Sequence, residues 1–216
     1  IVAFYGAPVP VENHEYQACM TALEMNDKLD SLRNKWREEE GWPEIVHNMQ
    51  HRIGLSSGEM VTGNMGSTMR MNYTMMGDTV NIAARLEASA KQYGIYIQVN
   101  ESTYESAKDQ FEWRFLDYVR VKGKQLPVKV YELIAEKGKI SDVDKVAVEA
   151  FTHAQELYFN QDWDKAIKAF TDANKLENMF PGRTENPSNI YLQRCYQLKE
   201  NSPGKDWDGV WVLTKK

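Results

Sequence analysis

Hydrophobic residues in the first part of the chain recur with two different periods. A spacing of three or four predicts a long helix over residues 14–40 and a second helix from about Thr79 to Tyr93. Short apolar or alternating runs predict strands, and these are residues 1–5, 49–62 with a bend inside, 70–76, 96–99, 111–121 and 127–134. The first run is expected to be a buried strand that enters a turn at Gly6. Because helices and strands interleave, we predict an α/β or α+β sheet domain.

The pattern changes after Gly138, where the strand signals end. Two apolar stripes at helical spacing follow, made of Phe151, Ala154, Leu157 and Tyr158 and then of Trp163, Ala166, Ile167 and Phe170. Residues 160–162 form the predicted turn between them, and a third helix is expected around residues 187–199. This hairpin resembles a single tetratricopeptide-type unit. One unit cannot bury both of its faces, so we expect residues 139–216 to pack on the preceding domain, residues 1–138, or on a partner protein.

Composition and charge narrow the possible classes of function. The chain has 216 residues, of which 42% are hydrophobic and 11% aromatic, so it has apolar surface to bury and is not expected to be disordered. A net charge of -5 argues against nucleic-acid binding by bulk electrostatic attraction. Cys19 and Cys195 stand far apart, which suits neither a disulfide framework nor a zinc site and fits a reducing cytosol. No apolar run approaches the ~20 residues that a membrane-spanning helix needs.

The densest run of glycine and polar residues covers residues 63–87. It contains no Gly-Lys-Ser/Thr, so it is not a P-loop. The helix predicted from Thr79 is expected to have Asp78 as its N-cap and Val80, Ala83 and Ala84 on its buried side. Asn81 and Arg85 stand four residues apart on this helix and therefore share a face, where the fixed guanidinium fork suits a phosphate oxygen. From spacing alone, a solvated helix face is the simpler interpretation. The methionines of residues 60–76 are expected to fill the core, and residues 122–124 to form a charged hairpin tip.

Read as one string, residues 63–87 resemble the signature of the class III nucleotidyl cyclase catalytic domain. Further blocks follow in the family's order, and these are IVAFYGAP (1–8), HEYQACMTALEM (14–25), RIGLSSG (52–58) and VKGKQLPVKVY (121–131). The resemblance covers residues 1–136 and implies an α+β, ferredoxin-like fold of the βαββαβ type. The segments YFNQDWDKAIKAF and DWDGVWVLTKK resemble the C-terminal extension of bacterial membrane-anchored adenylyl cyclases.

The resemblance implies an adenylyl cyclase, which converts ATP to 3′,5′-cyclic AMP and pyrophosphate in intracellular signalling. Asn81 matches the asparagine that orients the ribose, and Arg85 matches the arginine that stabilises the transition state at the α-phosphate. Thr74 stands where the family reads the base, and a threonine there favours ATP. Lys122 matches the lysine that holds the terminal phosphates. Arg70 lies close to the triphosphate region in the family.

The resemblance also implies two metal ions, Mg²⁺ or Mn²⁺, held by two aspartates of the family. Those aspartates precede the strand that begins here at Ile1, so we expect no metal ligand in this chain. The start at Ile rather than Met agrees with a C-terminal portion of a cyclase, which is expected to be inactive alone. In the family, one domain supplies the aspartates and a second supplies the asparagine and arginine, which implies a homodimer. The intact protein is expected in the cytoplasm, or anchored to the inner membrane by upstream helices.

Three alternatives remain open at this point. A guanylyl cyclase is one, although Thr74 counts against it. A cyclase-like regulatory domain that naturally lacks the metal aspartates is another. In the third, the helical residues 141–216 are the functional part and serve as a protein-binding adaptor.

Overall fold

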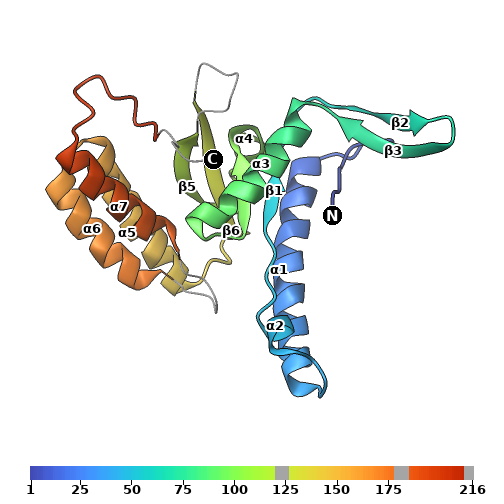
Figure 1. Ribbon diagram of the computed structural model, residues 1–216, viewed down its shortest axis with the longest axis horizontal. Helices are drawn as coiled ribbons and strands as arrows, with labels where there is room; N and C mark the ends of the chain where they lie inside the picture. The colour runs from blue at the N-terminus through green and yellow to red at the C-terminus, as the bar shows by residue number, and fades with distance from the viewer. Residues whose placement is uncertain (120–126, 178–184, 212–216) are drawn as a thin grey trace.

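The computed structural model describes residues 1–119, 127–177 and 185–211 (Figure 1). The helices are α1 (His14–Glu38), α2 (Glu44–His47), α3 (Asp78–Tyr93), α4 (Glu101–Ala107), α5 (Asp142–Phe159), α6 (Trp163–Leu176) and α7 (Pro187–Glu200). The strands are β1 (Ile53–Leu55), β2 (Val61–Ser67), β3 (Arg70–Met76), β4 (Ile97–Asn100), β5 (Phe111–Val119) and β6 (Val128–Glu136). None of the helices within these ranges is both long and apolar enough to cross a bilayer.

Four strands form one mixed sheet in the order β1-β4-β6-β5. β1 pairs with β4 in parallel, and the other two pairings are antiparallel. β2 and β3 form a separate antiparallel hairpin, which projects away from the sheet (Figure 1). The predicted α+β class is therefore confirmed, and the periodic runs for α1, α3 and the strands after residue 49 lie close to the observed elements.

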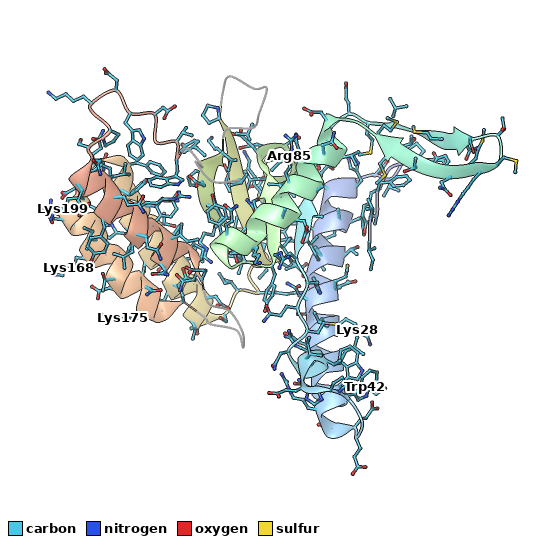
Figure 2. All side chains as sticks on the ribbon, viewed as in Figure 1. Lys28, Trp42, Arg85, Lys168, Lys175 and Lys199 are labelled. Atoms are coloured by element: carbon cyan, nitrogen blue, oxygen red, sulfur yellow. The ribbon has the colours of Figure 1, made fainter. Side chains whose placement is uncertain are left out.

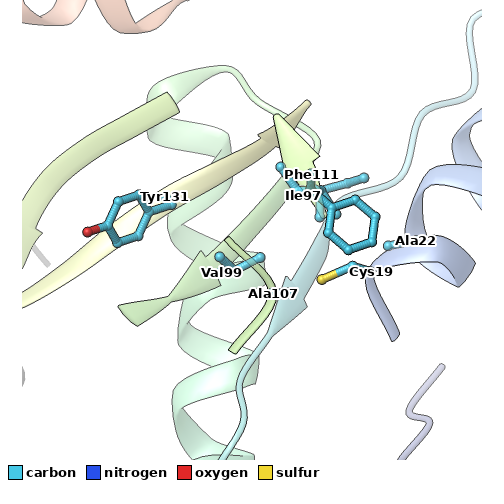
Figure 3. Close-up of a cluster of buried hydrophobic side chains, with 8 residues drawn as sticks. Cys19, Ala22, Ile97, Val99, Ala107, Phe111 and Tyr131 are labelled. Atoms are coloured by element: carbon cyan, nitrogen blue, oxygen red, sulfur yellow. The ribbon is translucent and has the colours of Figure 1, made fainter. Parts of the chain in front are cut away.

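Helices cover both faces of the sheet. On one face, Cys19 of α1 and Ala107 of α4 pack with Ile97 and Phe111 of the sheet (Figure 3). On the other face, α3 packs through a cluster made of Leu86, Ala90, Tyr93, Ile95, Leu116 and Val130. Neighbouring residues of one strand enter different clusters, as expected when successive side chains point to opposite faces.

Two predictions about buried segments are wrong. Residues 1–5 form no strand, and Ile1 and Val2 are exposed to solvent. A strand needs a hydrogen-bonded neighbour, and none of the strands in the described part of the chain pairs with this segment, although Phe4 stacks on Tyr73 of β3. The methionines of the hairpin do not fill a core either, because Met69 is 93% exposed and Met71 62%. A two-stranded ribbon standing apart from the sheet offers them no apolar layer to pack against.

Helices α5, α6 and α7, which together are called the helical region, pack on the sheet, as expected for a unit that cannot bury both faces alone. α5 and α7 lie against β5, the edge strand. The backbone carbonyl of Leu116 accepts hydrogen bonds from Gln155 Nε2 at 3.0 Å and from the Tyr191 hydroxyl at 2.7 Å. These side chains cover an edge that would otherwise present unpaired backbone groups. The β5–β6 register shifts between Phe115 and Asp117, so Leu116 stands at an irregularity of the ladder.

A buried ion network joins the same strand to α6. The Arg114 guanidinium, 5% exposed, donates through Nε to Glu132 Oε2 at 2.7 Å and through Nη1 to Glu177 Oε1 at 2.7 Å. Ser188 donates to the same oxygen of Glu177 at 2.9 Å. The two neighbouring carboxylates raise the pKa of Arg114 despite its burial. Burying these charges is tolerable only because every carboxylate faces a donor.

We expect Arg114→Met to lower the free energy of unfolding by about 3–5 kcal/mol, because it leaves buried carboxylates without their cation. Denaturation by urea, followed by circular dichroism, measures this change. The matched control is Lys175→Met, since Lys175 pairs with Asp172 on the surface and both side chains are more than half exposed. The control should leave the unfolding midpoint unchanged, and equal losses in both variants would contradict the role given to burial.

Candidate functional site

Helix α3 carries the two principal candidate residues. Asn81 and Arg85 are both exposed, one turn apart, and Ala84 and Ala88 beside them are exposed as well. Figure 2 marks Arg85 on this helix. Among the described residues, neither candidate side chain has a hydrogen bond or ion pair. Small alanines next to an unengaged amide and guanidinium leave room for a ligand that touches both.

The buried side of α3 differs in part from the prediction. It is formed by Thr79, Leu86, Ala90 and Tyr93. Ala84, expected on this side, is exposed instead. Asp78, expected as the N-cap, is the first residue inside the helix and Gly77 takes the cap position. An acidic residue in the first turn still interacts favourably with the helix dipole.

Gly54 of β1 sets the distance between the sheet and α3. A Cβ atom built on Gly54 would overlap the carbonyl oxygen of Ala83 and would lie 2.5 Å from the amide nitrogen of Glu87. The backbone of α3 therefore rests directly on β1 at the turn that contains Arg85. Arg52 adds an ion pair to Glu87, with 3.4 Å between Nε and Oε1.

The other end of α3 is held by a hydrogen bond. Tyr93, 3% exposed, donates its hydroxyl proton to Asp117 Oδ2 of β5 at 2.7 Å. Burial, followed by the charge of Asp117, raises the pKa of Tyr93, so the phenol stays a donor at neutral pH. Gly94 then ends the helix in the left-handed conformation, with φ at 63°.

The hairpin carries the two candidates that precede α3. Thr74 is half-buried on β3 and pairs with Gly63 of β2. Arg70 opens β3 opposite Ser67, at the tip of the hairpin. A strand rises about 3.4 Å per residue, so Arg70 lies about 20 Å along the ribbon from the end of β3, where α3 begins. The structure therefore groups Asn81 with Arg85, places Thr74 partway along β3 and separates Arg70 from them. Lys122 lies outside the described residues.

The candidates among the described residues do not line the cavity that lies beside the N-terminal segment. A cavity of about 650 Å³ is bounded by residues 3–11, by α1 and by the segment from Gly54 to Gly58. Ala83 is the residue of α3 that lines it. Within the described ranges no three His, Cys, Asp or Glu side chains come close enough to hold a metal ion. The face that holds Asn81 and Arg85 is open to solvent.

Three residues that hold α3 on the sheet, Gly54, Tyr93 and Asp117, were not predicted from the sequence. For Gly54 a signal existed, because a glycine inside an apolar strand suggests the close approach of another backbone. For the Tyr93–Asp117 pair there was none, since the two residues stand 24 positions apart and neither belongs to a spaced motif.

We expect Gly54→Ala to destabilise the protein by about 1–3 kcal/mol, because the added methyl overlaps the backbone of α3. The free energy of unfolding measured in urea tests this. Gly63→Ala is the matched control, since a Cβ on Gly63 of β2 meets no atom within 4 Å. Equal stability of the two variants would contradict the close contact of β1 and α3.

Comparisons with known proteins agree with this arrangement. A family model described as "Adenylate and Guanylate cyclase catalytic domain" matches residues 2–135. Adenylate cyclase 1 of Rhizobium meliloti (strain 1021) is 33% identical over 134 residues, 62% of this chain and 19% of the relative. Adenylate cyclase of Anabaena cylindrica is 37% identical over 112 residues, 50% of this chain and 22% of the relative. The matches thus span about a fifth of these relatives.

A solved structure is similar as well. The crystal structure of the adenylyl cyclase CyaB from P. aeruginosa matches with a TM-score of 0.53 and 26% sequence identity, over 63% of this chain and 68% of that chain. The family model spans the sheet, the hairpin and helix α3, so residues 2–135 belong to the adenylate and guanylate cyclase catalytic domain family.

Proposed function

We propose that this chain contributes Asn81 and Arg85 to an adenylyl cyclase, which forms 3′,5′-cyclic AMP and pyrophosphate from ATP. The observation that carries the proposal is the pair itself. An amide and a guanidinium lie exposed on one face of α3, and neither has a hydrogen-bond or ion-pair partner among the described residues. Gly54 holds the backbone of this helix close to β1. The named adenylate cyclases among the relatives favour the same reaction.

The chemistry needs positioning and charge neutralisation. The 3′-hydroxyl of ATP releases its proton to solvent and its oxygen attacks the α-phosphorus in line. The bond from phosphorus to the bridging oxygen breaks, and pyrophosphate leaves with the electron pair. Arg85 would donate hydrogen bonds to the oxygens on which charge develops. The Asn81 amide would hold the ribose so that its 3′-oxygen points at phosphorus. Arg85 therefore acts mainly on turnover, and Asn81 on the fraction of bound ATP that is correctly oriented.

Three further residues complete the proposed substrate contacts. Thr74 has a hydroxyl that can donate or accept a hydrogen bond, which suits the adenine edge. Lys122 and Arg70 would neutralise phosphate charge. Arg70 lies at the tip of the β2–β3 hairpin, which projects away from the four-stranded sheet (Figure 1). It would therefore contact a nucleotide held by a second domain rather than one beside α3.

The metal ions require residues beyond those described. Mg²⁺ and Mn²⁺ prefer carboxylate oxygens in close groups, and the described ranges offer no group of three or more metal-binding side chains. The residues present therefore do not fit a metal site, and we propose that residues of the intact protein outside the described ranges, on the second chain of a homodimer, supply the ligands. The exposed apolar side chains of the hairpin, among them Met71, Tyr73 and Met76, support a partner there.

We propose that residues 139–216 form a tetratricopeptide-like extension with a surface for a protein partner. Its exposed apolar side chains, Val143, Val146 and Tyr196, support this. A cytoplasmic location is proposed for the site, in keeping with two buried cysteines that form no disulfide.

Arg85→Ala tests the proposed function. In the natural full-length protein with ATP and Mg²⁺ or Mn²⁺, we expect kcat for cyclic AMP to fall by roughly 10²–10³, by analogy with a lost oxyanion donor, and KM for ATP to change much less. Chromatographic measurement of cyclic AMP provides the rates. Lys91→Ala is the matched control, because Lys91 is an exposed cation in the last turn of the same helix.

Two outcomes would contradict the proposal. A folded wild-type protein that makes no cyclic nucleotide would leave the regulatory or adaptor alternatives. Preferential turnover of GTP would favour the guanylyl cyclase and would show that Thr74 does not select adenine.

A further inference from the structure

One carboxylate connects α3 to the C-terminal helices. Asp117, 2% exposed on β5, accepts from the Tyr93 hydroxyl and from Arg194 Nη1, both on Oδ2 and both at 2.7 Å. Its other oxygen accepts from the backbone amide of Tyr118 at 2.8 Å and from the Tyr191 hydroxyl at 3.2 Å. Four donors from three separate elements therefore converge on one buried group.

The position of the Arg194 guanidinium of α7 is fixed by several contacts. Arg194 is 5% exposed, and its guanidinium carbon lies 4.9 Å from the centre of the Tyr191 ring and 5.9 Å from that of Tyr93. Trp211, beyond α7, lies 5.1 Å from the same carbon. Stacking on several rings and a bond to a carboxylate leave the guanidinium few other positions.

Ile190 of α7 packs against the cluster that contains Leu86 and Tyr93, but part of the contact between α3 and α7 is open. A cavity of about 150 Å³ lies between them, lined by residues that include Gln92, Tyr93, Gln193 and Arg194. Close packing therefore does not fix the end of α3 against α7 along this side. The hydrogen bonds to Asp117 do so instead.

We propose that Tyr93, Asp117 and Arg194 are positioning residues, through which the C-terminal helices set the orientation of α3 and hence the place of Arg85. The inference rests on the proposed function. Tyr93 and Arg85 stand eight residues apart on one helix, about 12 Å along its axis. Gly54 and the buried side chains of Leu86 and Ala90 hold the middle of α3 on the sheet. A shift at Tyr93 moves the C-terminal end of this one helix and thereby changes the orientation of Arg85.

A small displacement is enough to matter. A misplacement of about 1 Å at a reacting group can cost on the order of 10² in rate, because charge stabilisation depends on the exact distance and angle to the oxygen. The effect should appear in kcat rather than in KM for ATP, since Arg85 acts on charge that develops in the transition state.

Tyr93→Phe is the closest test, since it keeps the buried ring and removes the hydroxyl that binds Asp117. In the natural full-length protein we expect kcat for cyclic AMP to fall by about 10-fold, with KM for ATP changed by less than about 3-fold. Tyr131→Phe is the matched control, because Tyr131 is 6% exposed and its hydroxyl makes no hydrogen bond to the described residues. The control should retain the wild-type kcat.

A double-mutant cycle separates positioning from general destabilisation. If Tyr93 acts through Arg85, Tyr93→Phe should change kcat by less than about 2-fold in an Arg85→Ala background. A 10-fold loss in both backgrounds would overturn the proposal, because a merely structural defect is independent of Arg85. Arg194→Lys, which keeps the charge and loses the fork, should show the same pattern as Tyr93→Phe.

The outcomes keep the two proposals distinct. An active wild-type protein whose kcat is unchanged by Tyr93→Phe would overturn the positioning role and leave the proposed function intact. A folded wild-type protein without cyclase activity would overturn both.

Discussion

The carboxylate of Asp117 connects the sheet, helix α3 and the C-terminal helices, and their arrangement depends on it. It belongs to an edge strand of the sheet and is almost fully buried, and burying a carboxylate is costly unless hydrogen-bond donors surround it. Those donors come from α3, from α7 and from its own strand. A charge that would be costly alone thus requires the helical region, the sheet and the candidate helix to be in place together.

The edge position of β5 explains why the helical region is there. An edge strand exposes backbone carbonyls, and an irregular ladder at Leu116 exposes them further. Gln155 and Tyr191 satisfy that carbonyl, while Arg114 and Asp117 on the same strand bind Glu177 and Arg194 of the helical region. Polar contacts of this kind are specific in direction, so they fix an orientation that apolar packing alone would leave loose.

Prediction from the sequence was correct where the residue pattern within a single helix or strand is sufficient. The face shared by Asn81 and Arg85 follows from helical period alone, as does the position of α3. Prediction failed where a neighbouring element decides the outcome. Residues 1–5 have the pattern of a buried strand, but none of the described strands pairs with them and Ile1 and Val2 are exposed. Met69 and Met71 were expected in the core, but both are exposed on the hairpin. The ion pair of Asp117 with Arg194 spans 77 positions and has no periodic signature, so only the fold brings it into view.

The candidate residues lie on an exposed face of α3, while the opposite face of this helix packs closely on the sheet, and these two properties are related. Asn81 and Arg85 point away from their own domain, so their place relative to a substrate held elsewhere depends on the orientation of α3. Backbone contact at Gly54, the buried side chains of Leu86 and Ala90 and the hydrogen bond from Ser89 to Gln98 hold the middle of that helix on the sheet. The bond from Tyr93 to Asp117 holds its C-terminal end, and Arg194 of α7 binds the same carboxylate. A domain whose candidate groups face outward is thereby connected, through one buried carboxylate, to the helices that follow it.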